Sequence, residues 1–150
     1  MNIAVITGAS SGMGRDFVYA IDKEFNLDEI WVIARREERL LELQKDCRAK
    51  IRPIALDLAV SENYEIYKGL LEEHKPEIQV LINNAGFGLF GEFSQLDLDK
   101  QLNLIDLNVK AMHLLAKLAL DKMVERNKGY VLNVASSAGL LAAGPYMSAY

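Results

Sequence analysis

The sequence predicts an α/β fold in which helices cover both faces of a doubly wound parallel sheet of about five strands. Three observations predict it. Short apolar runs rich in β-branched residues alternate with longer amphipathic stretches along the chain, which is the order of strands and helices in such a sheet. The short runs are apolar throughout, as in strands buried on both faces. The chain has 150 residues, the length of one domain.

Five apolar runs are predicted to be the strands, and they span residues 3–7, 30–34, 51–56, 78–82 and 130–135. Pro53 lies inside the third run. Because proline has no backbone N–H to donate to a ladder, we expect this strand at an edge of the sheet. The connections between parallel strands are expected to be right-handed.

Three shorter helices are predicted from their apolar faces. The first carries Phe17, Val18, Ile21 and Phe25 on one side. The second spans residues 36–47 and aligns Leu40, Leu43 and Cys47. Ser61 is expected to cap the third, which ends before Pro76 and whose inner face holds Tyr67, Leu70, Leu71 and His74.

One long helix is predicted from Leu98 to Arg126. The stripe expected to face the core consists of Leu98, Leu102, Ile105, Val109 and Met112, continued by Leu115, Leu118 and Ala119. A second apolar row consists of Leu104, Leu107, Ala111, Leu114 and Leu118. A helix that is apolar over so much of its surface needs a second partner.

The charge balance excludes some classes of function. The chain carries 17 Lys and Arg against 21 Asp and Glu, a formal net charge of −4. A nucleic-acid footprint needs clustered basic residues, and the only dense basic spot is Arg35-Arg36. No nucleic-acid partner is therefore expected.

Cysteine usage and the N-terminus indicate a cytoplasmic protein. Cys47 is the only cysteine, so neither an internal disulfide nor a zinc site built from thiolates is expected. His74 and His113 lack the spacing of metal ligands, and no metal is expected. The N-terminus has no basic segment before its apolar run, so it is no signal peptide. Nowhere do about 18 apolar residues follow one another, as a membrane span would require.

A glycine-rich turn lies between the first strand and the first helix, with the sequence Thr7-Gly8-Ala9-Ser10-Ser11-Gly12-Met13-Gly14. Free backbone N–H groups at a helix N-terminus stabilise a pyrophosphate there, and glycines let the backbone approach it closely. The spacing is G-x-x-x-G-x-G rather than G-x-G-x-x-G. We expect a phosphate site formed by Gly8, Ser10, Ser11, Gly12, Met13 and Gly14; a Gly/Ser-rich loop without a ligand is the alternative.

Four segments in order give the sequence a specific resemblance. They are the turn Thr7-Gly8-x-x-x-Gly12-x-Gly14, then Leu56-Asp57-Leu58, then Asn83-Asn84-Ala85-Gly86, and finally Asn133-x-x-Ser136-Ser137-x-x-Gly139 with Tyr150 after it. Together they resemble the classical short-chain dehydrogenase/reductase family, whose members have a Rossmann-type nucleotide-binding domain. The resemblance covers the whole chain.

The resemblance implies positions for cofactor-binding residues. Asp57 and Leu58 match the segment that contacts the adenine. Asn84, Ala85 and Gly86 belong to the motif that braces the sheet and lies beside the cofactor. Asn108, on the long helix, matches the asparagine whose main chain holds a water of the proton relay.

The second strand carries the residues that distinguish the two nicotinamide cofactors. An acid about 20 positions after the glycines binds a ribose 2′-hydroxyl, whereas an arginine there accommodates a 2′-phosphate. Arg35 lies 21 residues after Gly14, Arg36 follows it, and the first acid is Glu37. NADP(H) is therefore predicted over NAD(H). Arg36 could instead be a solvated residue opening the next helix, and Arg15 is a weaker candidate for the same phosphate.

Reduction of a carbonyl by hydride needs a proton donor at the developing alkoxide and a donor that polarises the carbonyl. In the family a serine precedes the catalytic tyrosine by thirteen residues, and a lysine follows it by four. Ser137 and Tyr150 alone have the first spacing, so the resemblance implies that Tyr150 is the acid/base and Ser137 the orienting donor. Ser136 and Tyr146 are expected to be bystanders.

Two functions remain open on the sequence. The first is an NADP-dependent oxidoreductase acting on a carbonyl or alcohol substrate, of which residues 1–150 are the N-terminal Rossmann portion. That portion would lack the C-terminal strands, the lysine and the substrate lid, and would be inactive alone. The second is a short noncatalytic Rossmann module that binds a nucleotide or a protein partner. For the enzyme, the resemblance implies a homodimer or homotetramer assembled through the helix Leu98–Arg126.

Overall fold

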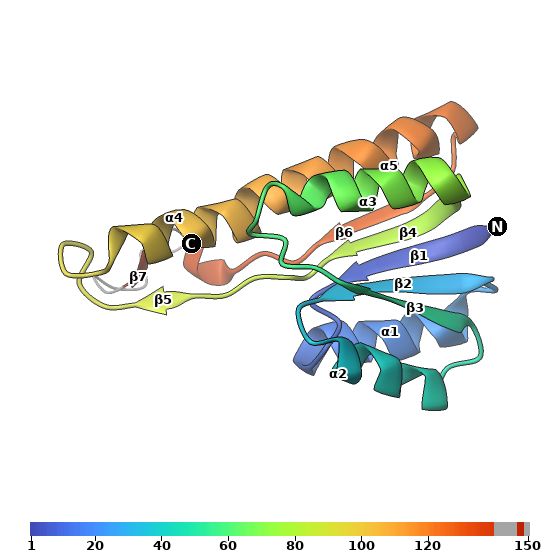
Figure 1. Cartoon of the computed structure of the whole chain (residues 1–150), viewed down its shortest axis with the longest axis horizontal. Helices are drawn as coiled ribbons and strands as arrows, with labels where there is room; N and C mark the ends of the chain where they lie inside the picture. The colour runs from blue at the N-terminus through green and yellow to red at the C-terminus, as the bar shows by residue number, and fades with distance from the viewer. Residues whose placement is uncertain (140–146, 149–150) are drawn as a thin grey trace.

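The computed structural model describes residues 1–139 and 147–148, and its body is one parallel sheet with helices on both faces (Figure 1). The strands are β1 (Asn2–Thr7), β2 (Glu29–Ala34), β3 (Lys50–Ala55), β4 (Glu77–Asn83) and β6 (Tyr130–Asn133). They are ordered β3-β2-β1-β4-β6, and every neighbouring pair is parallel. The predicted doubly wound sheet is confirmed, as is the edge position of β3 with Pro53. The strand order reverses between β1 and β4.

Different connections between strands cover the two faces of the sheet. On one face lie α1 (Gly12–Glu24) and α2 (Glu37–Leu41), and α2 continues as the 3-10 helix η1 (Glu42–Lys45). On the other lie α3 (Asn63–His74) and α5 (Met112–Arg126) (Figure 1). The single helix predicted over 36–47 is therefore shorter than expected, and its second half is a 3-10 helix rather than an α-helix. There the Gln44 side chain bonds Cys47 O, Ala49 O and Ile51 N, which leads the chain into β3.

The predicted cap of α3 is wrong. The N-cap residue is Glu62, which makes no side-chain capping bond. Ser61 instead gives its backbone carbonyl to Tyr64 N (3.1 Å), and its hydroxyl accepts a hydrogen bond from Lys110 Nζ (2.7 Å). The serine side chain therefore joins α3 to the long helix rather than closing its own helix.

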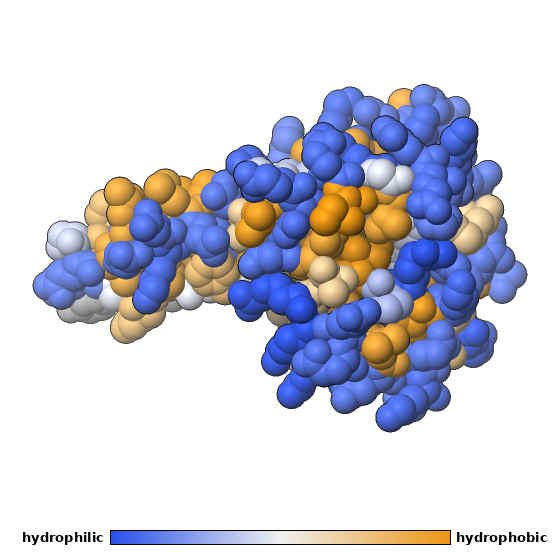
Figure 2. Space-filling model, in the orientation of Figure 1, coloured by the Kyte–Doolittle hydropathy of each residue, from blue (hydrophilic) through white to orange (hydrophobic). Residues whose placement is uncertain are grey.

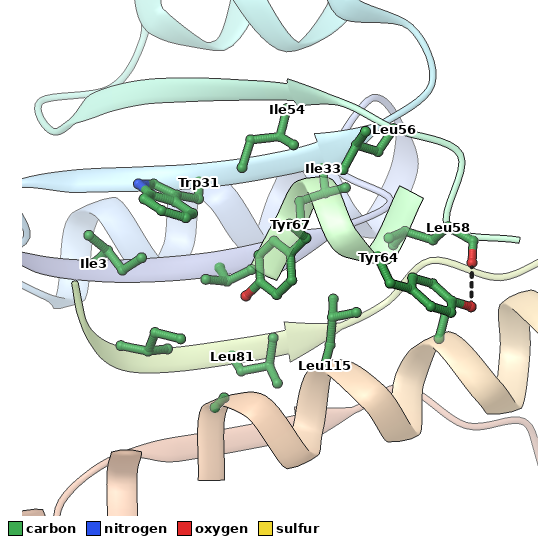
Figure 3. Packing of buried hydrophobic residues seen from close by; sticks show 14 of the residues in the cluster. Ile3, Trp31, Ile33, Ile54, Leu56, Leu58, Tyr64, Tyr67, Leu81 and Leu115 are labelled. Carbon is green, nitrogen blue, oxygen red and sulfur yellow. Dashed lines mark hydrogen bonds between the residues drawn. The ribbon is translucent and has the colours of Figure 1, made fainter. Parts of the chain in front are cut away.

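Two apolar clusters fill the layers on either side of the sheet. One lies under α3 and α5 and holds Trp31 and Tyr67, both fully buried (Figure 3). Figure 3 also shows Tyr64 in this layer, where its hydroxyl donates to Leu58 O (2.9 Å). The other lies under α1 and α2 and combines alternate residues of β1, β2 and β4 with residues of the two helices. Strands buried on both faces explain the continuous apolar runs.

The long helix has two apolar faces, but their roles differ from the prediction. It consists of α4 (Leu98–Ile105), a π-helical segment η2 (Asp106–Ala111) and α5. The buried residues are Gln101, Leu104, Ala111, Leu115, Ala119 and Met123. Four residues of the predicted core stripe, Leu98, Leu102, Ile105 and Val109, are instead 65, 50, 43 and 57% exposed.

A polar residue selects the buried face of α4. Gln101 is 8% exposed, and its Nε2 donates to the carbonyls of Phe93 (3.4 Å) and Leu96 (3.1 Å). Because those carbonyls precede the helix and need donors, Gln101 turns toward them and brings Leu104 with it. The spacing of apolar residues contains no information about this hydrogen bond. It therefore favours the stripe that begins at Leu98 as the buried face, although that stripe is exposed.

Beyond the sheet, the chain forms a projecting lobe that the sequence did not predict. Strand β5 (Leu89–Phe90) pairs with β7 (Met147–Ser148) in antiparallel fashion, and α4 lies over them (Figure 1). We call residues 87–105 together with Met147 and Ser148 the arm. No helix in the described part of the chain is long and apolar enough to cross a membrane.

A buried carboxylate holds β2 and β3 together at the end of the sheet away from the turn. Glu29 is 5% exposed and accepts hydrogen bonds from Arg52 Nε (2.7 Å), Lys50 Nζ (2.9 Å) and Trp31 Nε1 (3.0 Å). Burial alone would raise the pKa of Glu29, but these donors outweigh it and lower the pKa from 4.5 to about 2. A carboxylate of lowered pKa stabilises the fold above its unfolded pKa, and that contribution is lost as the pH falls toward the folded pKa.

Glu29→Gln is expected to lower the free energy of unfolding of the full-length protein by about 3 kcal/mol at pH 7, because two cations lose their buried partner. The difference between variant and wild type should shrink between pH 4.5 and about 2. Urea unfolding at a series of pH values measures it. The control is Glu65→Gln, which removes an exposed carboxylate paired with Lys68 and should cost below about 0.5 kcal/mol. If the loss of unfolding free energy in Glu29→Gln does not change with pH, this account is contradicted.

Candidate functional site

A cavity of about 190 Å³ opens at the carboxyl ends of the strands, beside the reversal between β1 and β4. Open α/β sheets bind ligands at this kind of position. Of the residues predicted to bind the cofactor, the lining contains Gly8, Ser10, Ser11, Arg35, Arg36, Asp57, Leu58, Ala85 and Gly86. Ile33, Ala34, Leu56 and Leu107 complete it. Five segments of the sequence thus meet at one place.

The glycine-rich turn has the conformation that the sequence motif requires. Gly8 and Gly12 have φ values of +67° and +54°, which side chains with a Cβ rarely adopt. Gly8 N donates to Ile33 O (2.8 Å), which draws the turn over the end of β2. A Cβ on Gly14 would overlap the Gly8 carbonyl and the Asn84 side chain. Gly14 therefore allows α1 to start directly against the turn.

Gly12, Met13 and Gly14 do not line the cavity; they form the first turn of α1. The N-cap Ser11 makes no side-chain bond to the helix, and the first turn carries no acid. No side chain therefore caps the backbone N–H groups at this N-terminus. The first turn also has no carboxylate that would neutralise the positive end of the helix dipole. Such an end stabilises an anion.

Thr7 organises the junction between β1 and β4, a role that sequence reasoning missed. Its side chain is buried, and its Oγ1 accepts hydrogen bonds from Asn84 N (2.9 Å) and Ala85 N (2.8 Å). The Asn84 side chain returns a bond to Thr7 O (3.1 Å). Asn84 therefore holds the backbone at the start of the glycine-rich turn and does not line the cavity. The only sequence signal for this role was a threonine at the start of the glycine-rich motif. The same residue is also expected simply as the last residue of a β-strand.

The two arginines at the end of β2 both line the cavity and are both exposed. Arg36 Nη2 lies 3.3 Å from Ser10 Oγ and donates to it, so this guanidinium is directed at the glycine-rich turn. Arg15, the weaker candidate, is engaged elsewhere: its Nε donates to Tyr19 Oη (2.9 Å), and its Nη1 lies 3.5 Å from Glu42 Oε2. The cationic side of the cavity is thus formed by β2 and not by α1.

Asp57 and Leu58 are fixed by their own loop. Asp57 Oδ1 accepts from Ala59 N (3.0 Å), and the Asp57 carbonyl accepts from Asn63 Nδ2 (2.9 Å). The Leu58 carbonyl accepts from the Tyr64 hydroxyl. These bonds hold the loop after β3 where it lines the cavity, beside the end of β2 that leads into Arg35 and Arg36.

Asparagine side chains fix the backbone on the other side of the cavity. Asn83 Nδ2 donates to Asn133 Oδ1 (2.9 Å) and Met112 O (3.3 Å), which joins β4, β6 and the long helix. Asn108, in η2, accepts from Phe87 N (3.1 Å) and donates to Phe87 O (2.8 Å). A Cβ on Gly86 would lie 3.1 Å from Asn108 Oδ1. The side chain of Asn108 is thus committed to the loop after Gly86.

The predicted catalytic residues are only partly described. Ser137 begins the short 3-10 helix η3 (Ser137–Gly139), just after β6, and is exposed. Ser136 Oγ accepts a hydrogen bond from Ala138 N (3.2 Å), as a turn residue does. Tyr146 and Tyr150 lie outside the described residues. Of the predicted catalytic set, the structure therefore places Ser137 and Asn108.

Other chemistry-bearing residues lie away from the cavity. Burial, with the nearby Asp22 and Asp46, raises the pKa of the Cys47 thiol to about 11, so this thiol is neutral at pH 7. His74 packs edge-on against Trp31 and lies 3.3 Å from Arg52. Within residues 1–139 and 147–148, no group of three or more His, Cys, Asp or Glu side chains could hold a metal ion.

Known proteins with similar sequences and structures identify the family to which this chain belongs. The family model for short chain dehydrogenases matches residues 2–150. The chain is 32% identical to the very-long-chain 3-oxoacyl-CoA reductase of Rattus norvegicus, and the match covers 98% of this chain and 48% of the rat protein. The chain thus spans about half the length of this curated relative.

Solved structures agree in fold. A short-chain dehydrogenase from Sphingobium yanoikuyae in complex with NADPH superposes with a TM-score of 0.84 at 26% identity, covering 95% of this chain and 57% of that one. A 4-hydroxyisoleucine dehydrogenase complexed with NADH gives a TM-score of 0.83 at 26% identity, covering 97% and 59%. The match of the family model over nearly all 150 residues, together with the turn, the strand reversal and the asparagine motif, shows that this chain belongs to the short-chain dehydrogenase family of oxidoreductases.

Proposed function

We propose that the full-length protein is an NADP(H)-dependent oxidoreductase that interconverts a carbonyl compound and the corresponding alcohol. The observation that carries the proposal is the cavity at the strand reversal, where the N-terminus of α1 and two arginines lie on one side and the loop after Asn84 on the other. NADPH, when bound, supplies the hydride that reduces the carbonyl carbon. The uncapped N-terminus of α1 and the two arginines suit the phosphate groups of such a dinucleotide.

The choice of NADP(H) rests on Arg35 and Arg36. Relatives of this fold hold either NADPH or NADH, so family membership does not decide between them. A guanidinium forms paired, charge-assisted hydrogen bonds with a phosphate dianion, whereas an acid at the end of β2 would repel it. The bond from Arg36 to Ser10 keeps one guanidinium beside the turn before any ligand arrives.

For the chemical step we propose that Tyr150 gives its phenolic proton to the carbonyl oxygen as hydride reaches the carbon, and that Ser137 donates a hydrogen bond to the same oxygen. In the oxidative direction Tyr150 takes the proton back. The support is the thirteen-residue spacing between Ser137 and Tyr150 and family membership. Asn108 is proposed to take part in the proton relay through its main chain, since its side chain is bonded to Phe87.

We also propose that the full-length protein is a homodimer or homotetramer assembled through the long helix. The stripe of Leu98, Leu102, Ile105 and Val109 is exposed along α4 and η2, and Leu120 and Val124 continue the apolar surface on α5, 42 and 73% exposed. Orange surface gathers on the projecting lobe in Figure 2. Exposed apolar stripes of this length mark interaction sites, and a second copy of the same helix matches them by two-fold symmetry.

The cofactor assignment predicts a charge-specific effect at Arg35. In the full-length protein, Arg35→Asp is expected to weaken NADPH binding at least about tenfold and to change NADH binding less than about twofold, because only NADPH carries the 2′-phosphate. Fluorescence titration of both cofactors measures this. Arg39→Asp makes the same charge change at an exposed α2 position that does not line the cavity, and should leave both affinities unchanged. Wild-type protein that binds NADH as tightly as NADPH would refute the assignment.

The catalytic assignment predicts a loss confined to turnover. Tyr150→Phe is expected to lower kcat by about 10²–10⁴-fold, the range of general acid catalysis, with the Kd for NADPH nearly unchanged. Tyr146→Phe is the matched control and should keep the wild-type rate. Steady-state assay with a carbonyl substrate distinguishes them. A Tyr150→Phe variant that retains more than a tenth of the rate shows that Tyr150 is not the acid. NADPH binding without turnover of any carbonyl compound by wild type would favour the noncatalytic module.

The assembly is tested by light scattering of the full-length protein at micromolar concentration. We expect a mass of two or four subunits for wild type and a monomer mass for Leu102→Glu with Val109→Glu, because two buried charges would have no partner. Ile66→Glu, on the exposed face of α3, should keep the wild-type mass. A wild-type monomer contradicts the proposal.

A further inference from the structure

Three phenylalanines follow one another at intervals of three residues in the loop after Gly86. Phe87, Phe90 and Phe93 are 37, 76 and 71% exposed. The proposed catalysis does not use them, and none of them belongs to the apolar clusters around the sheet. Large aromatic rings exposed together on one short segment are uncommon in soluble proteins and mark contact surfaces.

The backbone that carries these rings is held at three separate points. Asn108 binds both the N–H and the carbonyl of Phe87, Gln101 binds the carbonyl of Phe93, and Phe90 pairs with Met147 in the β5–β7 ladder. An amide side chain or a strand therefore fixes each phenylalanine at its main chain while its ring stays at the surface. A fixed backbone under exposed rings is pre-organised for binding, because little ordering entropy remains to be lost.

This surface begins next to the cofactor cavity, and its strand partner is close in sequence to the proposed acid Tyr150. Gly86 lines the cofactor cavity and directly precedes Phe87. The strand partner of β5 is β7, which ends at Ser148, two positions before Tyr150 in the sequence. A carbonyl compound whose reacting end meets the cofactor and Tyr150 would extend its remaining part along the arm.

The chemistry of the surface indicates what would lie there. The rings are apolar, and Asn108 and Gln101 already occupy main-chain groups of Phe87 and Phe93. The segment thus offers apolar contact rather than hydrogen bonds at these residues. The exposed stripe of α4, which we assign to a second subunit, contains neither Gln101 nor Leu104, so the face that holds the loop is distinct from it.

We propose that Phe87, Phe90 and Phe93 bind the apolar part of the substrate, an elongated aliphatic chain attached to the carbonyl group. The inference rests on the proposed function, because it assigns these rings to the same site. Three exposed rings spaced along one extended segment of seven residues suit an elongated ligand better than a compact one. The arm thereby sets the preference for substrate length, while the cavity at the strand reversal holds the cofactor.

The test compares two ketones of different length in the full-length protein. We measure kcat/KM with NADPH for decan-2-one and butan-2-one in wild type and in the double variant Phe90→Ser with Phe93→Ser. Because burying an aromatic ring stabilises a complex by more than a factor of ten, the ratio of decan-2-one to butan-2-one activity should fall at least about tenfold. Phe90→Leu with Phe93→Leu should restore most of it. Ile66→Ser, which removes an exposed apolar side chain on α3, should leave the ratio unchanged.

A second readout does not depend on turnover. Calorimetric binding of decan-2-one to the NADP⁺ complex, in which no reaction is possible, should be at least about tenfold weaker in the double serine variant. If the variant keeps the wild-type ratio and binding, or if wild type does not bind decan-2-one, the proposal is wrong. If wild type reduces no ketone but binds decan-2-one through these rings, the surface stands and the proposed reaction fails. If the variant turns an oligomer into a monomer, the rings contact a second copy and the proposal is overturned.

Discussion

The hydroxyl of Thr7 joins the two strands on either side of the strand reversal, and the arrangement of the site depends on it. Its oxygen accepts hydrogen bonds from two backbone N–H groups at the start of the loop after β4, which joins the ends of β1 and β4. Asn84 closes the same junction from the other side through Thr7 O. Gly14 then lets α1 begin directly against this junction, where any Cβ would collide. The helix N-terminus and the loop after β4 face one cavity because these contacts fix both to β1.

Amide side chains hold much of the loop backbone on the β4 side of this edge. Asn83 joins two strands and the long helix, Asn108 holds Phe87, and Gln101 holds the loop before α4. Each amide has both a donor and an acceptor, so one side chain can satisfy backbone groups of either kind. This explains why polar residues lie buried in places where hydrophobic patterning predicts none. The loops held in this way contribute to the cofactor cavity and to the arm.

Much of the fold and part of the site could be predicted from the sequence. Continuous apolar runs indicated the parallel sheet, Pro53 its edge, and the glycine spacing the turn, because each is a local consequence of backbone chemistry. Contacts between distant segments were not predictable in this way. The buried face of α4 depends on Gln101 and two carbonyls, the Ser61 hydroxyl on Lys110, and the arm on the pairing of β5 with β7. The roles of Ser137 and Tyr150, the oligomeric state and a cytoplasmic location stay predictions.

The cavity at the strand reversal is central to the proposed function, because it must be the dinucleotide site. A crystal structure of the full-length protein with NADP⁺ tests this most directly. It should show the diphosphate over Gly12–Gly14 at the start of α1, the adenine beside Asp57 and Leu58, and the 2′-phosphate within hydrogen-bonding distance of Arg35 or Arg36. A dinucleotide bound at another edge of the sheet, or a 2′-phosphate directed into solvent away from both arginines, would contradict the proposed function.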